Sequence, residues 1–298
     1  MVHVRYRTSW FQLPKMNPLF LLLIPPLAAL LIVGWILFWT AFTHLHWIRF
    51  YHRIDQEPPS ISRRGWLRFY LHTLGAALEI IWWACAHMFQ NGLREPPGEK
   101  TGPPVICVHG FHMTGSCMWG IRRRLENRGR PTRSVFLGSP YQSAEVYAKP
   151  LARVMHDLRS QFNDQGFDIV AHSMGGLITR KVLADDPELA ASARRIVTLG
   201  SPHHGTGLLS WIRFGPVYRM MSLDSPFIKA LPDLRASAPG TEVTTVATEQ
   251  DLIVYPVSTC FLPGSRQVTL KGLGHLGLLT DPEALDVIVE ALAPVPHP

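Results

Sequence analysis

A serine between a run that predicts a strand and a run that predicts a helix constrains this chain more than any other feature. Residues 167–170 (Phe-Asp-Ile-Val) predict a short buried strand, and from Leu177 onward apolar residues recur at helical spacing. The intervening residues 171–176 read Ala-His-Ser-Met-Gly-Gly. At such a sharp turn the neighbours of Ser173 must be small, and its hydroxyl is exposed at the edge of the sheet. Ser173 is therefore a candidate nucleophile; the alternative is an ordinary turn in which the serine caps the helix.

A nucleophilic serine also needs N–H donors for the oxyanion that forms when it attacks a carbonyl. Residues 104–108 predict a buried strand that leads into Gly110. A glycine here lets the backbone turn, so we expect the N–H of Phe111 to point into the site. The N–H of Met174, one residue past the serine, is the second expected donor.

A base and an orienting acid must complete such a site. Residues 242–247 predict a strand whose following loop carries Asp251, and residues 266–270 predict a strand that leads to His275. Serine, acid and histidine thus occur in the chain order that a strand–turn–helix nucleophile requires. Asp224 is an alternative acid, but no predicted strand precedes it.

Four segments together resemble the α/β-hydrolase superfamily, and more narrowly bacterial triacylglycerol lipases and esterases: residues 108–111, 171–176, 199–206 and 274–275. The run Ser-Pro-His-His-Gly-Thr at 201–206 is the most lipase-like of them. The resemblance covers roughly residues 103–293 and implies acyl transfer through a serine, aspartate and histidine triad. It does not extend to the first hundred residues.

Strands alternate with helices over residues 103–298, which predicts an α/β domain whose mostly parallel sheet is covered by helices on both faces. Between residues 207 and 240 the alternation lapses into an apolar, irregular segment. We interpret this segment as a short lid above the serine. The alternative is that its apolar side chains fill the core.

The first 48 residues predict a transmembrane anchor. No Asp, Glu, Lys or Arg occurs from Met16 to Ile48, and the almost wholly apolar stretch from Leu19 to Phe42 exceeds the roughly 20 residues that cross a bilayer. A cleaved signal peptide is the competing interpretation, but its apolar core would be only about 7–15 residues long. The run is too long for that, so we expect a permanent single-pass anchor in the cell (inner) membrane.

Residues 49–102 predict a membrane-proximal amphipathic helix and a linker. On a helix from Trp66 to Gln90, one narrow polar stripe interrupts an apolar surface. The stripe consists of Arg68, His72, Glu79, Gln90 and, near its edge, His87; the apolar surface holds Leu67, Leu71, Leu74, Leu78, Ile81 and Trp82. Such a helix suits the membrane interface or a place against the catalytic domain. A second spanning helix is the alternative, but it would expose Glu79 to lipid.

Charge and cysteine content bound the partners. The chain carries 29 Lys and Arg against 22 Asp and Glu, and the first hundred residues hold 10 of the former and 5 of the latter. A basic excess beside an apolar segment favours anionic lipid headgroups over nucleic acid. The four cysteines lack metal-type spacing, and the pair His203 and His204 has no companion ligand nearby, so we expect neither a metal nor a cofactor.

The sequence therefore predicts a membrane-anchored serine esterase or lipase that acts on carboxylic esters of lipids, either acylglycerols or phospholipids. An acyltransferase or thioesterase using the same triad is an alternative, because the nucleophile does not select the acceptor. A catalytically silent lipid-binding membrane protein is another. The presence of all three residues, Ser173, Asp251 and His275, argues against a silent protein.

Overall fold

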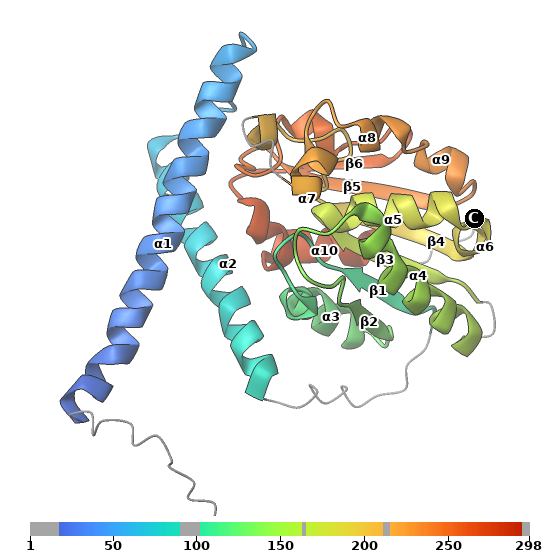
Figure 1. The fold of residues 1–298 in the computed structure, drawn as a ribbon, viewed down its shortest axis with the longest axis horizontal. Helices are drawn as coiled ribbons and strands as arrows, with labels where there is room; N and C mark the ends of the chain where they lie inside the picture. The colour runs from blue at the N-terminus through green and yellow to red at the C-terminus, as the bar shows by residue number, and fades with distance from the viewer. Residues whose placement is uncertain (1–17, 90–101, 163–164, 211–214, 294–298) are drawn as a thin grey trace, which may run out of the picture.

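The structure is a computed structural model that describes residues 18–89, 102–162, 165–210 and 215–293. A single six-stranded sheet forms the centre of the domain that follows residue 102 (Figure 1). Its strands are β1 (Val105–Val108), β2 (Thr132–Val135), β3 (Phe167–His172), β4 (Ala193–Leu199), β5 (Glu242–Thr248) and β6 (Arg266–Leu270). All neighbouring strands are parallel, which confirms the predicted α/β fold class.

Helices cover both faces of this sheet. Successive residues of a strand point to opposite faces, so Ile106 and Val108 join one buried cluster while Val105 and Cys107 join another. The first cluster includes α4 (Ala144–Gln161), α5 (Met174–Asp185) and α6 (Pro187–Ser192); the second includes α3 (Trp119–Glu126) and α10 (Pro282–Ala291). The four residues of β1 are fully buried because helices enclose the strand from both sides.

The strand order β2-β1-β3-β4-β5-β6 contains one reversal of direction. From β1 the chain moves outward to β2, and from β3 it moves the opposite way to β6. Helices that connect the strands then pass to different sides, and a crevice opens beyond the carboxyl ends of β1 and β3. This is where an open parallel sheet of this kind places its functional residues.

The segment predicted as a lid forms four short elements: η2 (Gly207–Ser210), α7 (Gly215–Met221), α8 (Pro226–Ala230) and α9 (Leu234–Ser237). Leu209, Val217, Met220, Met221 and Ile228 are buried in the cluster that α4 and α5 share. These side chains pack as the alternative to a lid describes, in which the apolar residues of the segment fill the core. Residues 211–214, part of the same apolar run, lie outside the described residues.

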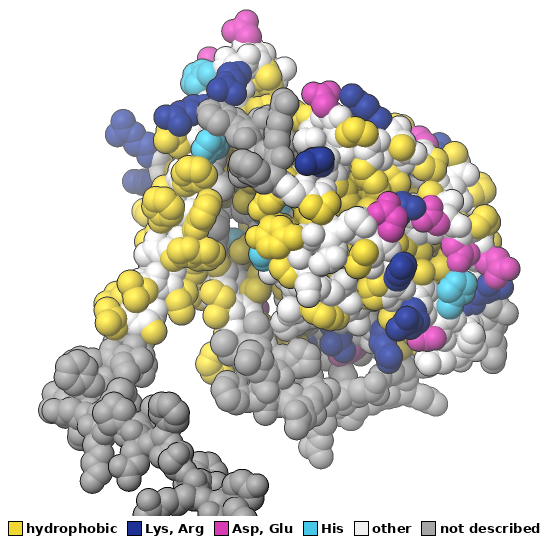
Figure 2. All heavy atoms as spheres, in the orientation of Figure 1, with side chains coloured by type: hydrophobic (Ala, Val, Ile, Leu, Met, Phe, Trp, Pro, Cys, Tyr) yellow, Lys and Arg dark blue, Asp and Glu magenta, His cyan; other side chains and the backbone are white. Residues whose placement is uncertain are grey.

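Helix α1 (Pro18–Arg53) is long and apolar enough to cross a membrane, and it is the one such helix in the described parts of the chain. Only 11% of its most apolar window is buried, whereas a core helix of a soluble domain would be mostly buried. Figure 2 shows hydrophobic side chains along its exposed length. Leu30, Trp35 and Phe38 are among the exposed apolar residues of α1.

Helix α2 (Arg63–Phe89) returns beside α1 and packs on the sheet domain (Figure 1). It contacts η1 (Gly115–Met118) and η4 (His275–Leu279). Of the predicted polar stripe, His72 faces the domain, with its Nε2 3.1 Å from Asp281 Oδ2. Leu67, Leu71 and Trp82 of the predicted apolar surface are exposed instead, because Phe69, Ala76 and Ala77 make the buried face.

Aromatic residues join the two N-terminal helices to the sheet domain. Trp47, Phe50 and Tyr51 of α1 and Phe69 of α2 form a buried cluster with Leu252 and Tyr255 of the loop after β5. The rings of Phe50 and Tyr255 lie edge to face with their centroids 5.1 Å apart. The helices therefore contact the same loop that carries Asp251.

Candidate active site

Ser173 stands at the turn between β3 and α5 with a backbone φ of +55°, a conformation that costs energy for any residue with a side chain. Its N–H donates to Leu199 O at 2.9 Å, which ties the turn to the neighbouring strand. Glycine is needed beyond it, because a Cβ on Gly176 would collide with Ser201 Oγ. The Ser173 hydroxyl makes no capping hydrogen bond to α5, so the alternative of a merely capping serine does not describe this turn.

Asp251 and His275 come together from two different loops. Asp251 Oδ2 lies 2.7 Å from His275 Nδ1, and its Oδ1 accepts hydrogen bonds from the N–H groups of Ile253 and Val254 at 2.8 Å each. Both side chains are buried, with 2% of the Asp251 side chain exposed. These contacts fix the carboxylate and one ring nitrogen, leaving Nε2 of His275 for a substrate or a nucleophile. The alternative acid Asp224 is exposed and pairs with Lys229.

The backbone around Leu199 and Gly200 brings Ser173 and His275 to the same edge of the sheet. Leu199 accepts from the Ser173 N–H, and a Cβ on Gly200 would lie only 3.0 Å from His275 Nδ1. Among the described residues the Ser173 hydroxyl makes no hydrogen bond to His275. Such a bond is often long in a site without substrate and tightens when the substrate binds.

The backbone of the β1 loop closes over the serine. A Cβ on Gly110 would lie 2.8 Å from Ser173 Cβ, so only glycine permits this approach. Within the described residues, neither the N–H of Phe111 nor that of Met174 has a hydrogen-bond acceptor, and both residues line a cavity of 290 Å³. The N–H groups of the two predicted oxyanion donors thus carry no hydrogen bond that would compete with a developing negative charge.

Three further histidines serve the architecture of the site. His109 donates from Nδ1 to Gly110 O at 2.8 Å and accepts from the Leu137 N–H at Nε2, which fixes the glycine loop. Burial, and then the charge of His275, hold the pKa of His172 well below its usual range, so His172 is neutral and donates from Nε2 to His275 O. Burial likewise keeps His203 neutral by lowering its pKa, with Nε2 3.0 Å from Thr198 Oγ1.

Thr206 positions the loop that carries Asp251. It lies at the end of the lipase-like run 201–206, and the sequence alone did not assign this role to it. Its hydroxyl donates to Ile253 O at 2.6 Å and accepts from the N–H groups of Leu208 and Tyr255. These bonds connect the start of the segment 207–240 to the loop that carries Asp251. The position of Thr206 at the end of the run is the signal that could have pointed to it.

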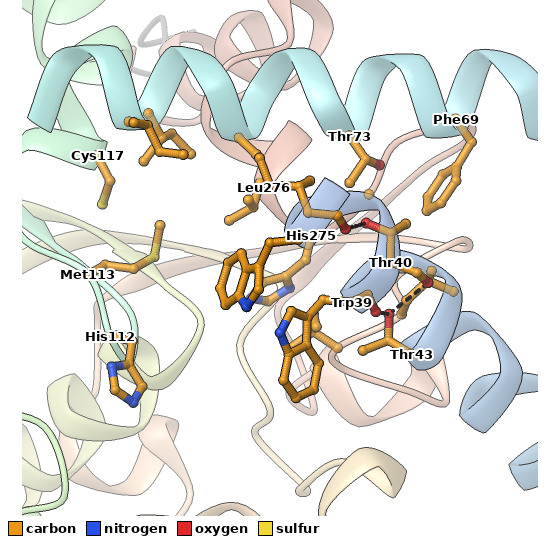
Figure 3. Close-up of a pocket in the computed structure, with 18 of the residues that line it drawn as sticks. Trp39, Thr40, Thr43, Phe69, Thr73, His112, Met113, Cys117, His275 and Leu276 are labelled. Atoms are coloured by element: carbon orange, nitrogen blue, oxygen red, sulfur yellow. Dashed lines mark hydrogen bonds between the residues drawn. The ribbon is translucent and has the colours of Figure 1, made fainter. Parts of the chain in front are cut away.

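A larger cavity of 570 Å³, also absent from the sequence analysis, lies between α1, α2 and the loop of His275 (Figure 3). Its walls include Trp39, Thr40 and Thr43 of α1 and Phe69 and Thr73 of α2. The signal in the sequence was the pair Thr40 and Thr43, three residues apart in an otherwise apolar helix. Such residues often face protein rather than lipid, so they mark the side of α1 that faces the cavity.

Comparisons with known proteins show which families this chain is similar to. Residues 104–247 match the family model of palmitoyl protein thioesterase. A triacylglycerol lipase of Pseudomonas fragi is 33% identical over 121 residues, which make up 38% of this chain and 39% of the lipase. A triacylglycerol lipase of Burkholderia plantarii is 25% identical over 187 residues, 58% of this chain and 50% of that lipase. The chain thus spans half or less of these two relatives.

Solved structures share the fold. The mature lipase BlEst2 of Bacillus licheniformis superimposes with a TM-score of 0.56 at 18% identity, covering 68% of this chain and 96% of that one. Aspergillus fumigatus lipase B gives a TM-score of 0.55 at 18% identity, covering 66% and 53%. The chain is therefore an α/β-hydrolase-fold protein, and its similarity is to the lipases and esterases of that superfamily.

Proposed function

We propose that this protein is a membrane-anchored serine esterase or lipase that hydrolyses carboxylic esters of lipids, acylglycerols or phospholipids. The observation that carries the proposal is the 2.7 Å contact between His275 Nδ1 and Asp251 Oδ2 at the sheet edge where Ser173 occupies a strained turn. Such strain persists only where the surrounding structure holds it, and it is concentrated at reactive sites.

The proposed chemistry is acyl transfer in two steps. Asp251 holds His275 with its proton on Nδ1, so that Nε2 accepts the hydroxyl proton of Ser173 as the serine oxygen attacks the ester carbonyl. The N–H groups of Phe111 and Met174 stabilise the oxyanion of the tetrahedral intermediate. His275 then protonates the departing alcohol. A water molecule, deprotonated by His275, finally hydrolyses the acyl-enzyme and regenerates Ser173.

A lipid substrate is supported by what surrounds the site. Helix α1 has the length and composition of a membrane span, and α2 also exposes large apolar side chains, among them Leu71 and Trp82. Large exposed apolar surface is typical of proteins that contact lipid or another protein. An anchor beside the site would hold it close to the bilayer, where the available esters are membrane lipids.

Labelling and lipid hydrolysis together test this function. We expect a fluorophosphonate probe to label the full-length protein and its Ser201→Ala variant, but not the Ser173→Ala variant, because Ser173 is the proposed nucleophile and Ser201 is fully buried. The protein should release free fatty acid from triacylglycerol or phosphatidylcholine presented in vesicles. Hydrolysis confined to small water-soluble esters would contradict the lipid assignment, and transfer of the acyl group to added lysolipid would favour the acyltransferase.

A thioesterase is the second candidate, favoured by the family match of residues 104–247. The same triad would attack a thioester carbonyl, with a thiol as leaving group in place of an alcohol. Palmitoyl esters and thioesters with the same acyl chain distinguish the two. The ratio of kcat/KM for the thioester to kcat/KM for the ester is compared with the ratio of their uncatalysed hydrolysis rates. A larger enzymatic ratio would favour the thioesterase.

Attachment to the membrane has its own expected result. The full-length protein should stay in the membrane pellet through washes with high salt and with alkaline carbonate, because transfer of a helix as apolar as α1 into water is costly. The measurement is an immunoblot of pellet and supernatant, with a peripheral membrane protein as the control that salt releases. Release of this protein by salt alone would show that α1 does not span the bilayer.

A further inference from the structure

We propose that the 570 Å³ cavity between α1, α2 and the His275 loop binds a long hydrocarbon chain of a lipid ester, so that α1 forms part of the substrate site as well as an anchor. This inference rests on the proposed function and specifies its substrate class. The occupant to which it commits is one extended aliphatic chain, drawn from the bilayer that surrounds α1.

The cavity has three walls from parts of the chain far apart in sequence. Figure 3 shows Phe69 and Thr73 projecting from α2, and Trp39, Thr40 and Thr43 from α1, around Leu276 and His275. Met113 and Cys117 close the end near η1. Its volume falls within the roughly 300–1,000 Å³ typical of small-molecule sites.

The lining suits a chain without polar groups. No Asp, Glu, Lys or Arg lines it among the described residues. The hydroxyl of Thr40 donates to Ile36 O at 2.8 Å, and that of Thr43 donates to Trp39 O at 2.9 Å, so both are satisfied within α1. A polar ligand would lose its hydration against α1 without gaining hydrogen bonds from these two hydroxyls, whereas an aliphatic chain has no hydrogen bonds to lose.

One end of the cavity meets the reaction centre. His275 and Leu276 line it directly, and residues 112–114 line both this cavity and the smaller one beside Phe111 and Met174. The proposed binding mode places the ester carbonyl at these two N–H groups and the attached chain along α2. At this end the buried hydroxyl of Thr73 has no hydrogen-bond partner in the structure and lies next to Gly274. Because that oxygen is buried, it leaves this end of the cavity, among the described residues, without an accessible donor from α2.

The other end opens toward the surface that lipid would cover. Trp35 and Ile81 line the cavity and are also exposed, with 63% and 36% of their surface accessible. Trp35 lies within the apolar stretch of α1 and continues the exposed band of Leu31 and Phe38. An aliphatic chain can thus pass from the bilayer into the cavity without crossing water, which lowers the cost of leaving the membrane.

Filling the cavity tests the proposal. Ala77 lines it and is buried, whereas Leu78 beside it on α2 is exposed, so Ala77→Phe narrows the space and Leu78→Phe is the matched control. The substrates are p-nitrophenyl butyrate and p-nitrophenyl palmitate, with full-length protein in phosphatidylcholine vesicles. Each buried methylene contributes about fourfold to binding, so exclusion of a few should lower kcat/KM for palmitate at least tenfold relative to butyrate. The control should keep the ratio of the unaltered protein.

A second pair of variants and a labelling experiment complete the test. Thr40→Phe narrows the cavity from α1, and Ala41→Phe is its exposed control, which covers the case that Ala77→Phe does not fold. A second substrate series consists of acetate esters of aliphatic alcohols of increasing length. Comparison with the p-nitrophenyl esters shows whether the cavity binds the acyl chain or the alcohol chain of the ester. Unchanged length preference in both cavity variants, for both series, would overturn the proposal.

Labelling separates failure of the cavity from failure of the enzyme. The probe is a palmitate analogue with a terminal diazirine, irradiated with the Ser173→Ala protein in the same vesicles. It should label residues 35–43 or 69–81. Excess palmitate should suppress this labelling, and so should the additional substitution Ala77→Phe. Such labelling without any ester hydrolysis by the unaltered protein would refute the proposed function alone. Labelling that palmitate and Ala77→Phe leave unchanged would refute the cavity as the chain site.

Discussion

Replacement of Ser173 by alanine should lower kcat for ester hydrolysis by about 10⁶-fold, since loss of the nucleophile in a serine triad removes the whole covalent pathway. His275→Ala should cost a similar factor, because the serine then has no base. Asp251→Ala should cost less, about 10⁴-fold, because the imidazole remains but is no longer oriented. The measurement is hydrolysis of a short-chain ester by the full-length protein in detergent.

Asp224→Ala is the matched control for the acid. Its carboxylate is exposed and pairs only with Lys229, so activity should stay within about twofold of the unaltered protein, as expected of a surface substitution away from the site. The thermal unfolding of all four variants shows whether a loss is chemical or structural. Full activity in Asp251→Ala together with loss in Asp224→Ala would mean that the acid of the triad is misassigned.

Replacement of Phe50 by alanine should destabilise the protein by about 3–5 kcal/mol, the usual cost of removing a buried aromatic ring. Phe50 packs its ring edge to face on Tyr255 and fills the space above Gly207, where a Cβ would lie 2.6 Å from Phe50 Cε2. Asp251 lies in the same loop as Tyr255, four residues before it. We therefore also expect activity to fall at temperatures where the fold still persists.

Phe38→Ala is the control for this substitution, because the same ring on the same helix is exposed in the structure. It should change the midpoint of thermal unfolding in detergent by no more than a surface substitution does, about 0.5 kcal/mol in stability. Equal effects of the two substitutions would show that α1 does not pack on the catalytic domain as described.

The elements around the site were predictable because each depends on local sequence. A buried parallel strand reads as a continuous apolar run, and a polar residue directly after such a run must lie at the edge of the sheet. That reasoning located Ser173 after β3. Asp251 and His275 were located by their chain order in the loops after the predicted strands β5 and β6. The parallel sheet and its helices followed from the alternation of the same runs.

The packing of the N-terminal helices was not predictable in the same way. Lipid and protein interior are equally apolar, so hydrophobic residues alone do not tell which face of a helix meets which surroundings. On α2 the small residue Ala77 is buried while the larger Leu71 and Trp82 are exposed, the reverse of what size and hydrophobicity suggest. Only the shape of the neighbouring loops decides this. The same ambiguity made the apolar run after residue 207 compatible with both a lid and a core.

With α1 spanning the bilayer as proposed, the aromatic cluster that joins α1 to the loop of Asp251 would fix the height of the reaction centre above the membrane. The site could then neither rotate away from the membrane surface nor follow a substrate into solution. An enzyme held in this way meets its substrate by diffusion in two dimensions. Its rate would then depend on the mole fraction of the ester in the membrane rather than on the amount of ester per volume of solution, and dilution of the membranes into more buffer would leave the rate per protein unchanged.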